Sequence, residues 1–396
     1  MKNFYFLSIT IGAVFLATTI LWVVYNSYVP IMLKSFGISS FLVGLLMTVD
    51  NILAVTWGPL VGILSDNTKT RWGKRIPYFL VSIPFIALLF SLIPLAFLQG
   101  LIIFSLLLIL LNIFIATART PMVALIPDLF VSGLRSQSAG IINFMGGIGA
   151  VVGFLLFPSL YALQKEIPFL VASLIIIITG AWLVISIKEN KSDQIKEIRE
   201  NLFSEMIGIL KNKELLKVYL VIFTYFLGFN AIETFFTSYG KFQLGIEEHQ
   251  ASFLLGMLAV SFFLFSLPAG VIGGVIGKKK TMSIGLLLIS VVMAALFMID
   301  ALVIAPKLIL IASLLIVAGL CWALINVNAI PLVTDLSPPE KAGTGAGFYY
   351  FFSMSAAIVS PPLTGLIIDF MGYPVIFLIA SVFMLGGWFL LMRLRK

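Results

Sequence analysis

Residues 48–80 read TVDNILAVTWGPLVGILSDNTKTRWGKRIPYFL, and this stretch decides the fold of the chain. Its first half is apolar enough to lie in a lipid bilayer, although it carries Asp50 and Asn51, and it ends on the acid Asp66. A short turn rich in lysine and arginine follows, and Ile76 opens the next apolar run. The pattern predicts two membrane-spanning helices joined by a tight, positively charged turn.

The composition of the whole chain agrees with this interpretation. Of the 396 residues, 61% are hydrophobic and only 11% are charged, whereas a soluble domain carries about a quarter charged residues. The single cysteine, Cys321, excludes an internal disulfide. The first apolar run is too long for the core of a signal peptide and lacks a small-residue cleavage site, so we expect helix 1 to be retained.

The apolar runs predict an all-α membrane protein with twelve transmembrane helices in two pseudo-symmetric six-helix bundles. A spanning helix needs about 20 apolar residues, and with short loops the chain has room for roughly twelve. The spans fall near residues 5–33, 38–65, 76–97, 100–129, 137–163, 168–187, 215–240, 250–276, 282–304, 307–335, 342–370 and 373–392.

The basic residues predict the orientation of these helices. With the N-terminus inside, the inner segments hold 20 of the 25 lysines and arginines, and the outer loops hold four. By the positive-inside rule, both termini then lie in the cytoplasm and the protein is multi-pass in the cytoplasmic (inner or plasma) membrane. Because these residues lie in short loops, the net charge of +8 indicates topology and not nucleic-acid binding.

The only long polar segment divides the chain. We expect an N-terminal six-helix bundle over residues 1–187, a cytoplasmic linker over 188–214 and a C-terminal six-helix bundle over 215–396. Apolar residues recur through the linker at helical spacing, which favours an amphipathic helix on the inner membrane surface. The alternative is a solvated tether.

The two bundles are expected to be repeats. Asp128 and Asp335 each close a Pro-containing helix end, 207 residues apart, and each is followed six or seven residues later by a basic residue and a Gly- and Ser-rich helix. Inverted or parallel repeats of this kind place a binding site near the bilayer midplane and transport by rocking-type alternating access.

A charge inside a membrane span costs about 2.5–3.5 kcal/mol at the helix centre, and three of the charged residues in the predicted spans stand out. They are Asp50, Arg119 and Glu233, and we expect them to act in coupling. Counting residues puts Asp50 and Arg119 at similar depth, so a pair that forms only when the carboxylate is ionised can serve as a proton switch. A static ion pair that fixes helix packing and the absence of any contact remain as alternatives. Glu233 lies nearer the outer end.

Aromatic and amide side chains share several predicted helices. Such a combination suits a sugar, because the C–H faces of the ring stack on aromatics while the hydroxyls need donors and acceptors. The alternative is an interfacial aromatic belt. The candidate substrate-binding residues are Trp22, Tyr25, Asn26, Asn51, Asn112, Trp322, Asn326 and Tyr349.

The basic turn predicts a gate. Pairing of Asp66, Arg71 and Arg75 with Asp128 and Arg135 on the cytoplasmic side would lock the outward-open state and break on inward opening. Surface pairs contribute only about 0–1 kcal/mol each, but a network can bias a balanced equilibrium. Asp335 is the corresponding candidate in the second half, although that half has a glycine near the position of Asp66.

No phosphate-binding G-x-x-x-x-G-K-[ST] motif occurs, so we expect a transporter driven by an ion gradient, and neither an enzyme nor a protein with a cofactor or a metal site. The one histidine, His249, falls in a predicted outer loop, where a surface position is expected.

Two motifs resemble a known family. One looks like the helix 2–3 signature of the major facilitator superfamily, with the longer spacing of its sucrose/proton symporter branch, which is related to the glycoside–pentoside–hexuronide cation symporters. The other is similar to the helix 4 ending of that branch, G-P-x-R-A-L-x-A-D-L. The motifs are Gly62-x-x-Ser65-Asp66-x-x-x-x-Arg71-x-Gly73-Lys74-Arg75-x-Pro77 and Thr120-Pro121-Met-Val-Ala124-Leu125-Ile-Pro-Asp128-Leu129.

The chain departs from that branch at two positions. The helix 4 arginine of the branch would fall at Val123, and this chain places Arg119 one turn earlier instead. The acid that the branch carries about eleven residues before its arginine would fall at Asn112, which cannot titrate. Asp50 is then the replacement that the sequence offers for a proton carrier.

The resemblance and the residues together predict a monomeric transporter that imports a sugar, such as the disaccharides sucrose or maltose, with a cation, by proton symport. Sodium coupling and uniport remain open. A proton-coupled exporter of drugs or metabolites on the same fold is the alternative of a different class, and a sensor or structural membrane protein is a third.

Overall fold

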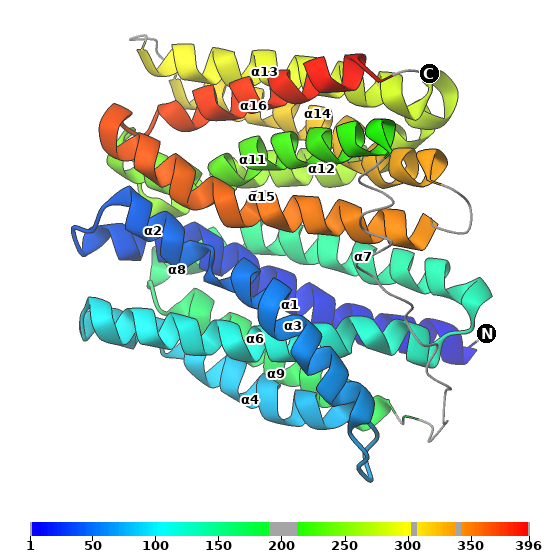
Figure 1. Cartoon of the computed structure of the whole chain (residues 1–396). Coiled ribbons are helices and arrows are strands. Elements are labelled where there is room, and N and C mark those ends of the chain that lie inside the picture. Colours follow the sequence, from blue (N-terminus) through cyan, green and yellow to red (C-terminus); the bar gives the residue numbers. More distant parts are fainter. Residues whose placement is uncertain (1, 188, 190–211, 302–306, 338–341, 395–396) are drawn as a thin grey trace. The chain divides into compact units, whose positions relative to one another are not determined.

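A computed structural model of the chain describes residues 2–187, 189, 212–301, 307–337 and 342–394. In these residues the regular structure is helical, apart from an isolated bridge between Thr70 and Gly73. The helices are α1 (Lys2–Ser35), α2 (Ser40–Met47), α3 (Val49–Asn67), α4 (Ile76–Ser91), α5 (Ile93–Leu98), α6 (Leu101–Leu129), α7 (Ser132–Leu155), α8 (Phe157–Leu163), α9 (Ile167–Ser186), α11 (Lys213–Phe242), α12 (Glu248–Ile276), α13 (Lys278–Ala301), α14 (Lys307–Leu336), α15 (Ala342–Met371) and α16 (Val375–Met392) (Figure 1).

Eleven helical stretches in the described residues are long and apolar enough to cross a membrane. The shorter apolar helix α4 is continued by α5, and together they cover the predicted span at 76–97. The prediction of an all-α membrane protein is confirmed.

Three predicted spans contain a break. The chain turns at Thr48 between α2 and α3, at Leu92 between α4 and α5, and at Leu156 between α7 and α8. A proline follows the last two breaks by two residues, as Pro94 and Pro158. Proline removes a backbone N–H and its ring collides with the carbonyl four residues earlier, so the preceding helix ends.

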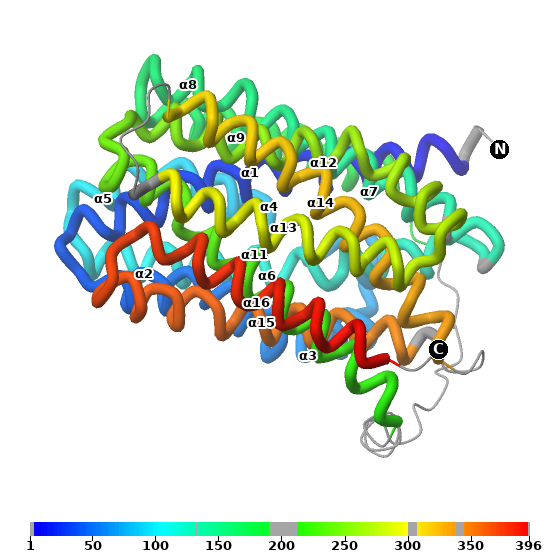
Figure 2. Tube along the Cα trace, turned by 90° about the horizontal axis from the view of Figure 1, so that it is seen from above, coloured from blue at the N-terminus to red at the C-terminus, as the bar shows by residue number. Residues whose placement is uncertain are grey.

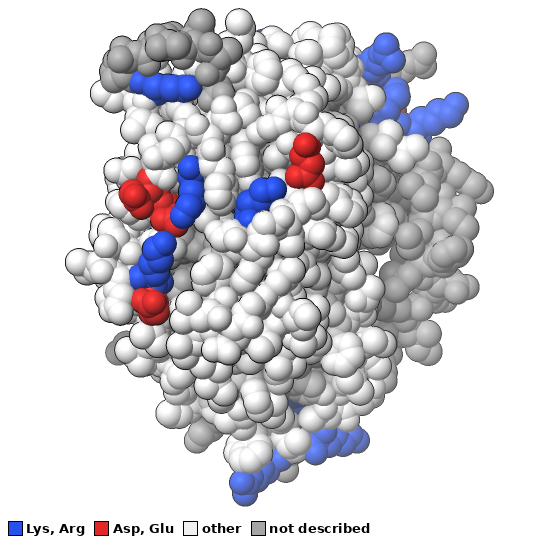
Figure 3. Space-filling view, turned by 90° about the vertical axis from the view of Figure 1, so that its left-hand side faces the viewer, with Lys and Arg blue, Asp and Glu red and all other residues white. Residues whose placement is uncertain are grey.

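Large apolar side chains cover the outside of the helices. Leu98, Ile185 and Leu267 are each at least 75% exposed, and many others are more than one-third exposed. Figure 3 shows one face of the molecule, on which lysine, arginine, aspartate and glutamate side chains are few among uncharged residues. So much exposed apolar surface is unfavourable in water, whereas the hydrocarbon of a lipid bilayer accommodates it.

The chain divides into two compact units. Unit 1 comprises Met1–Ile38, Leu46–Asp193 and Glu248–Phe253, and unit 2 comprises Ser39–Leu45, Gln194–Glu247 and Leu254–Lys396. The principal division falls within the predicted linker, but two short segments are exchanged: the first residues of α2 group with unit 2, and the start of α12 groups with unit 1. Residues 190–211, most of the predicted amphipathic linker, lie outside the described residues.

In unit 1, α1 packs along α7 through glycines, and Figures 1 and 2 show the two helices side by side. A Cβ at Gly149 would lie 2.5 Å from the carbonyl oxygen of Leu16, and one at Gly153 would lie 2.9 Å from Val23. Small residues allow this approach, which van der Waals packing stabilises in lipid. A buried apolar cluster that includes Phe79 joins α1, α4, α6, α7 and α9 at one end of the unit.

In unit 2, α11 packs on α15 and α16, and α13 packs on α14 and α16. The first residues of α2 rest on α15, where the carboxylate of Asp369 accepts the backbone N–H groups of Ser40 and Phe41 at 2.7 and 3.0 Å. An acid at a helix N-terminus satisfies donors that lack an intrahelical acceptor and complements the helix dipole.

The contact between α1 and α7 generates a stability prediction. Gly149→Val forces a side chain against the backbone of α1, so we expect the free energy of unfolding to fall by about 1–3 kcal/mol. The measurement is unfolding in detergent with a chemical denaturant, followed by the loss of helical circular dichroism. Gly140→Val, at an exposed position of α7 where a Cβ meets no described atom within 4 Å, is the control. Equal unfolding curves for the two variants would contradict the prediction.

Candidate functional site

Arg75 is the centre of an ion-pair network at one end of unit 1. The residue is only 4% exposed although it is the last residue of the basic turn. Its guanidinium donates to the carboxylate of Asp66 at the end of α3, to the hydroxyl of Ser65, and through Nε to the carboxylate of Asp128 at 2.9 Å. Lys74 reaches the second oxygen of Asp128 at 3.0 Å. One guanidinium thus joins the ends of α3 and α6 to the start of α4.

The other two predicted members of this network have different partners. The guanidinium of Arg71 lies over the ring of Trp72, 4.2 Å from its centroid. Arg135, on α7, donates to the backbone carbonyls of Phe130 and Pro127 at 3.0 and 3.1 Å, at the C-terminal end of the preceding helix α6. Within the described part of the chain neither forms an ion pair, so the predicted pairing of these two arginines with carboxylates is wrong for this structure.

The second repeat carries a reduced version of the network. Lys278, at the start of α13, pairs with Asp335, near the end of α14, as Lys74 pairs with Asp128. The side chain of Asp335 is 56% exposed and that of Asp128 only 15%. The residue near the position of Asp66 is Gly274, where a Cβ would meet no described atom within 4 Å. The asymmetry that the sequence predicts is therefore present.

The turn before α4 depends on Gly73 and on a carboxylate that the sequence analysis missed. Gly73 has φ +105°, a conformation that favours glycine. Glu189 lies two residues after Ile187, the C-cap of α9. Its carboxylate accepts the backbone N–H groups of Lys74, Arg75 and Ile76 at 2.7 to 3.1 Å. The sequence offered only a charged residue at the start of a linker, and nothing in its spacing pointed to α4.

A polar cluster lies in the membrane-spanning part of unit 1. The amide nitrogen of Asn112 on α6 donates to the hydroxyl of Tyr25 on α1 at 3.1 Å, and both residues are about 1% exposed. Asp50 lies on α3, which packs on α6, and the amide of Asn51 donates to the Asp50 carboxylate at 2.9 Å. Trp22 meets Tyr25 edge to face, with ring centroids 5.4 Å apart. The structure thus gathers five predicted residues.

One atom of this cluster lacks a protein partner. The amide oxygen of Asn112 is buried and accepts no hydrogen bond from any described residue. A buried acceptor without a donor costs about 1–3 kcal/mol, and such groups mark places where a ligand, an ion or water completes the arrangement.

The residue counts explain why these groups share one depth. Asp66 and Asp128 both bind Arg75, so they lie at the same level. Asp50 lies 16 residues before Asp66, and Asn112 lies 16 residues before Asp128, so both are about 24 Å of helix rise from that level.

The same count corrects the predicted pair of Asp50 and Arg119. Arg119 lies nine residues before Asp128, which is about 10 Å closer to the Arg75 level than Asp50. The neighbouring Thr117 indeed accepts a hydrogen bond from Trp57 on α3, two turns beyond Asp50. Arg119 is exposed, and in the described residues it forms no ion pair. The similar depth predicted for the two residues is therefore wrong.

In unit 2 the predicted aromatic residues form a packed cluster. Trp322 is 4% exposed and its ring stacks on Phe229 with centroids 4.0 Å apart, while Phe226 meets its edge and also that of Tyr349. The face of Trp322 toward Phe229 is therefore occupied in this structure. The remaining predicted residues Asn26, Glu233 and Asn326 are each half-buried.

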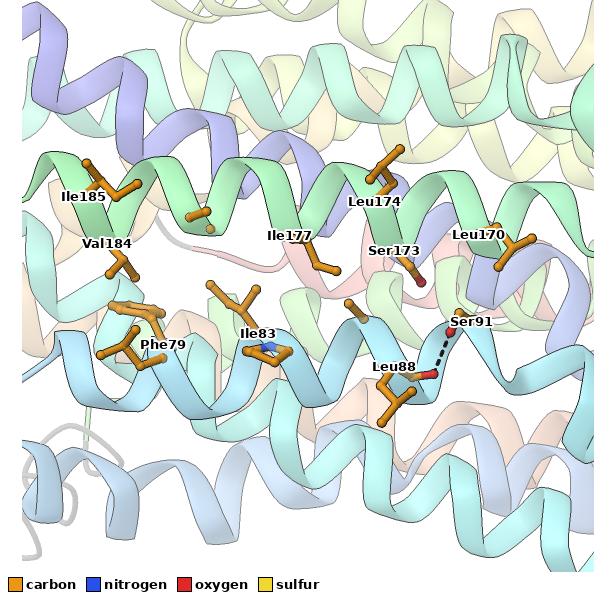
Figure 4. Close-up of a pocket in the computed structure, with 15 residues that line it drawn as sticks. Phe79, Ile83, Leu88, Ser91, Leu170, Ser173, Leu174, Ile177, Val184 and Ile185 are labelled. Atoms are coloured by element: carbon orange, nitrogen blue, oxygen red, sulfur yellow. Dashed lines mark hydrogen bonds between the residues drawn. The ribbon is translucent and has the colours of Figure 1, made fainter.

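A groove between α4 and α9 has a volume of about 620 Å³, but its chemistry does not suit a sugar. Figure 4 shows apolar side chains along both helices, including Phe79, Ile83, Leu174 and Ile177. Its polar side chains are Ser91, which donates to the carbonyl of its own helix at 2.8 Å, and Ser173. An apolar groove on the outer surface of a membrane helix pair is suited to hydrocarbon.

The comparisons with known proteins identify the class. A family model described as MFS/sugar transport protein matches residues 6–393, and the chain belongs to this family. It is a multi-pass membrane transporter and not an enzyme. The resemblance to the major facilitator superfamily is confirmed.

One curated relative is the isoprimeverose transporter of Lactiplantibacillus pentosus. It is 24% identical over 268 residues, which are 64% of this chain and 56% of the relative, so the match spans little more than half of that protein.

Solved structures share the fold. A bacterial homologue of the human lysosomal transporter Spinster, inward-facing and occupied, has a TM-score of 0.80 at 13% identity and covers 99% of this chain and 97% of its own. The nucleoside transporter NupG has a TM-score of 0.74 at 16% identity, with 98% of each chain covered.

The Arg75 network generates a prediction with a control supplied by the repeat. Asp128→Asn leaves a buried guanidinium short of a counter-charge, so we expect the free energy of unfolding to fall by about 3 kcal/mol. Asp335→Asn removes an exposed pair and is expected to cost about 0–1 kcal/mol. Chemical unfolding of both purified variants measures the difference. If Asp335→Asn lowers the free energy of unfolding as much as Asp128→Asn does, burial does not determine how much the ion pairs contribute to stability.

Proposed function

We propose that this chain is a cation-coupled symporter that imports a glycoside by alternating access. The observation that carries the proposal is the cluster around Asp50, in which one membrane-embedded carboxylate lies level with a buried tyrosine hydroxyl and an amide oxygen without a partner. Ionisable residues within a membrane span are costly and typically belong to ion or substrate pathways.

The substrate class follows from the same cluster and from the family. Trp22 and Tyr25 offer aromatic surfaces, and Asn112 and Asn51 offer amide donors and acceptors beside them. The description of the family and the name of the Lactiplantibacillus relative favour a sugar. In unit 2, Tyr349, Asn326 and Trp322 are the proposed substrate-binding residues, and the Trp322 ring would be exposed only after its contact with Phe229 rearranges.

Asp50 is the proposed coupling residue, because Asn112 cannot carry a proton. Protonation of Asp50, or binding of a cation to it, would neutralise the charge before the substrate crosses. Glu233 and Arg119 remain candidates for later steps of the cycle. A proton is the proposed cation, and sodium is the competing one.

The Arg75 network is the proposed gate. The positive charge of the turn before α4 supports a cytoplasmic position for it, with both termini on that side and the protein monomeric in the cytoplasmic membrane. Release of Arg75 from Asp66 and Asp128 would then accompany inward opening.

Uptake into proteoliposomes tests the proposal directly. Labelled sucrose, maltose and isoprimeverose are offered with no gradient, an inward proton gradient or an inward sodium gradient. Accumulation above equilibrium under the proton gradient, abolished by a protonophore, supports proton symport. Uptake without accumulation under either gradient supports uniport instead. An absence of flux for every glycoside would reject the sugar assignment and favour the exporter.

Asp50→Asn separates coupling from binding. The variant cannot gain or lose a proton at this position, so we expect accumulation to fall to the equilibrium level while sugar exchange between equilibrated compartments continues. The control is Glu166→Gln, which makes the same change at an exposed residue just before α9. Accumulation by the Asp50→Asn protein would exclude Asp50 as the proton carrier.

Trp22→Ala tests the aromatic surface. Loss of ring stacking is expected to raise KM for the transported glycoside about tenfold, which corresponds to about 1.4 kcal/mol of binding free energy. Trp182→Ala removes a 38% exposed tryptophan of α9 and is expected to leave KM unchanged. Initial-rate uptake gives both values, and an unaltered KM in the Trp22 variant would assign that residue to packing.

A further inference from the structure

Both carboxylate oxygens of Glu189 accept hydrogen bonds from the backbone at the start of α4. They accept three consecutive backbone N–H groups, with Lys74 at 2.7 Å, Arg75 at 2.8 and 3.1 Å, and Ile76 at 2.8 Å. The N–H of Ile76, the first residue of α4, is one that an α-helix leaves without an intrahelical acceptor, and the N–H groups of Lys74 and Arg75 directly precede it. The N-cap residue Arg75 makes no side-chain capping bond of its own, so Glu189 supplies the cap from a distant part of the chain.

The turn is shaped to admit this carboxylate. A Cβ at Gly73 would lie 2.6 Å from Cβ and Cδ of Glu189, so a side chain at position 73 would occupy the place of the acid. The negative charge also complements the positive end of the α4 dipole. Hydrogen bonds to an ionised acceptor are about twice as strong as those between neutral groups.

Arg75 therefore has two separate attachments. Its backbone N–H is held by Glu189, and its side chain is held by Asp66, Asp128 and Ser65. The guanidinium of Arg75 can contact both Asp66 and Asp128 only if the backbone of Arg75 is held in place relative to α3 and α6. Glu189 lies after α9, in the part of unit 1 that directly precedes the segment leading to unit 2.

We propose that Glu189 is a positioning residue for the Asp66–Arg75–Asp128 network, and that it ties the exit of the chain from unit 1 to that network. The inference deepens the proposed gate and rests on it for its role in transport. The packing part of the inference does not depend on the substrate. Glu189 acts through Arg75 and does not touch the transported molecule.

A double-variant cycle on unfolding tests the packing part without any sugar. Glu189→Ala, Asp128→Asn and the double variant are unfolded in detergent with a chemical denaturant, and the loss of helical circular dichroism gives the free energy of unfolding of each. Positioning predicts that the two losses are not additive, because Asp128→Asn already removes part of what Glu189 positions. Glu189→Ala combined with Gly149→Val, a change at the contact of α1 with α7 that shares no partner with Glu189, is expected to give additive losses.

Conservative variants separate charge from geometry. Glu189→Gln keeps one oxygen acceptor and loses the charge, so it is expected to recover part of the stability lost in Glu189→Ala. Glu166→Ala removes an exposed acid at the other end of α9 and is expected to behave as the unaltered protein. Full additivity of Glu189→Ala with Asp128→Asn, or an unaltered unfolding curve for Glu189→Ala, would overturn the inference.

Transport kinetics test the link to the gate. In proteoliposomes that accumulate a glycoside, Glu189→Ala is expected to lower the maximal rate and to leave KM unchanged, since the residue is remote from the aromatic and amide cluster. A raised KM with an unaltered maximal rate would contradict the gating role. If no glycoside is transported, the proposed function fails while the unfolding cycle still decides whether Glu189 positions Arg75.

Discussion

The burial of one guanidinium organises unit 1. Moving a charge out of water is costly unless counter-charges and hydrogen bonds replace the water, so Arg75 requires Asp66, Asp128 and Ser65 in a fixed arrangement. This requirement sets the relative heights of α3 and α6. It thereby determines which residues of the two helices lie at the same depth in the membrane, where Asp50, at the start of α3, and Asn112, near the middle of α6, share a level.

The bilayer imposes the remaining constraints. Backbone groups in hydrocarbon must be satisfied within the helices, and the breaks at Leu92 and Leu156 occur where proline permits them. Between helices, apolar burial gives little driving force because lipid is equally apolar, so glycine contacts such as Gly149 against α1 supply close packing.

The sequence predicted the helices and the core of the Arg75 network, because hydropathy and charge placement act locally along the chain. It failed for contacts that depend on how neighbouring helices are aligned along their axes. Arg119 was placed level with Asp50 because depth was counted from uncertain span ends, whereas the shared Arg75 anchor separates the two residues by about 10 Å. The cap by Glu189 and the cover of Trp322 by Phe229 each join helices that are distant in sequence, and no spacing rule indicates them.

The common level of Asp50 and Asn112 has an evolutionary meaning. In the symporter branch that the sequence resembles, the acid falls at the position of Asn112, on the neighbouring helix. A carboxylate can therefore pass from α6 to α3 without changing its distance from the membrane surface or its neighbour Tyr25. If Asp50 is the coupling residue proposed above, the titrating group would lie on a different helix in this chain but at the same electrical depth, so that the position of an acid in an alignment is a poorer guide to mechanism than its height in the bilayer.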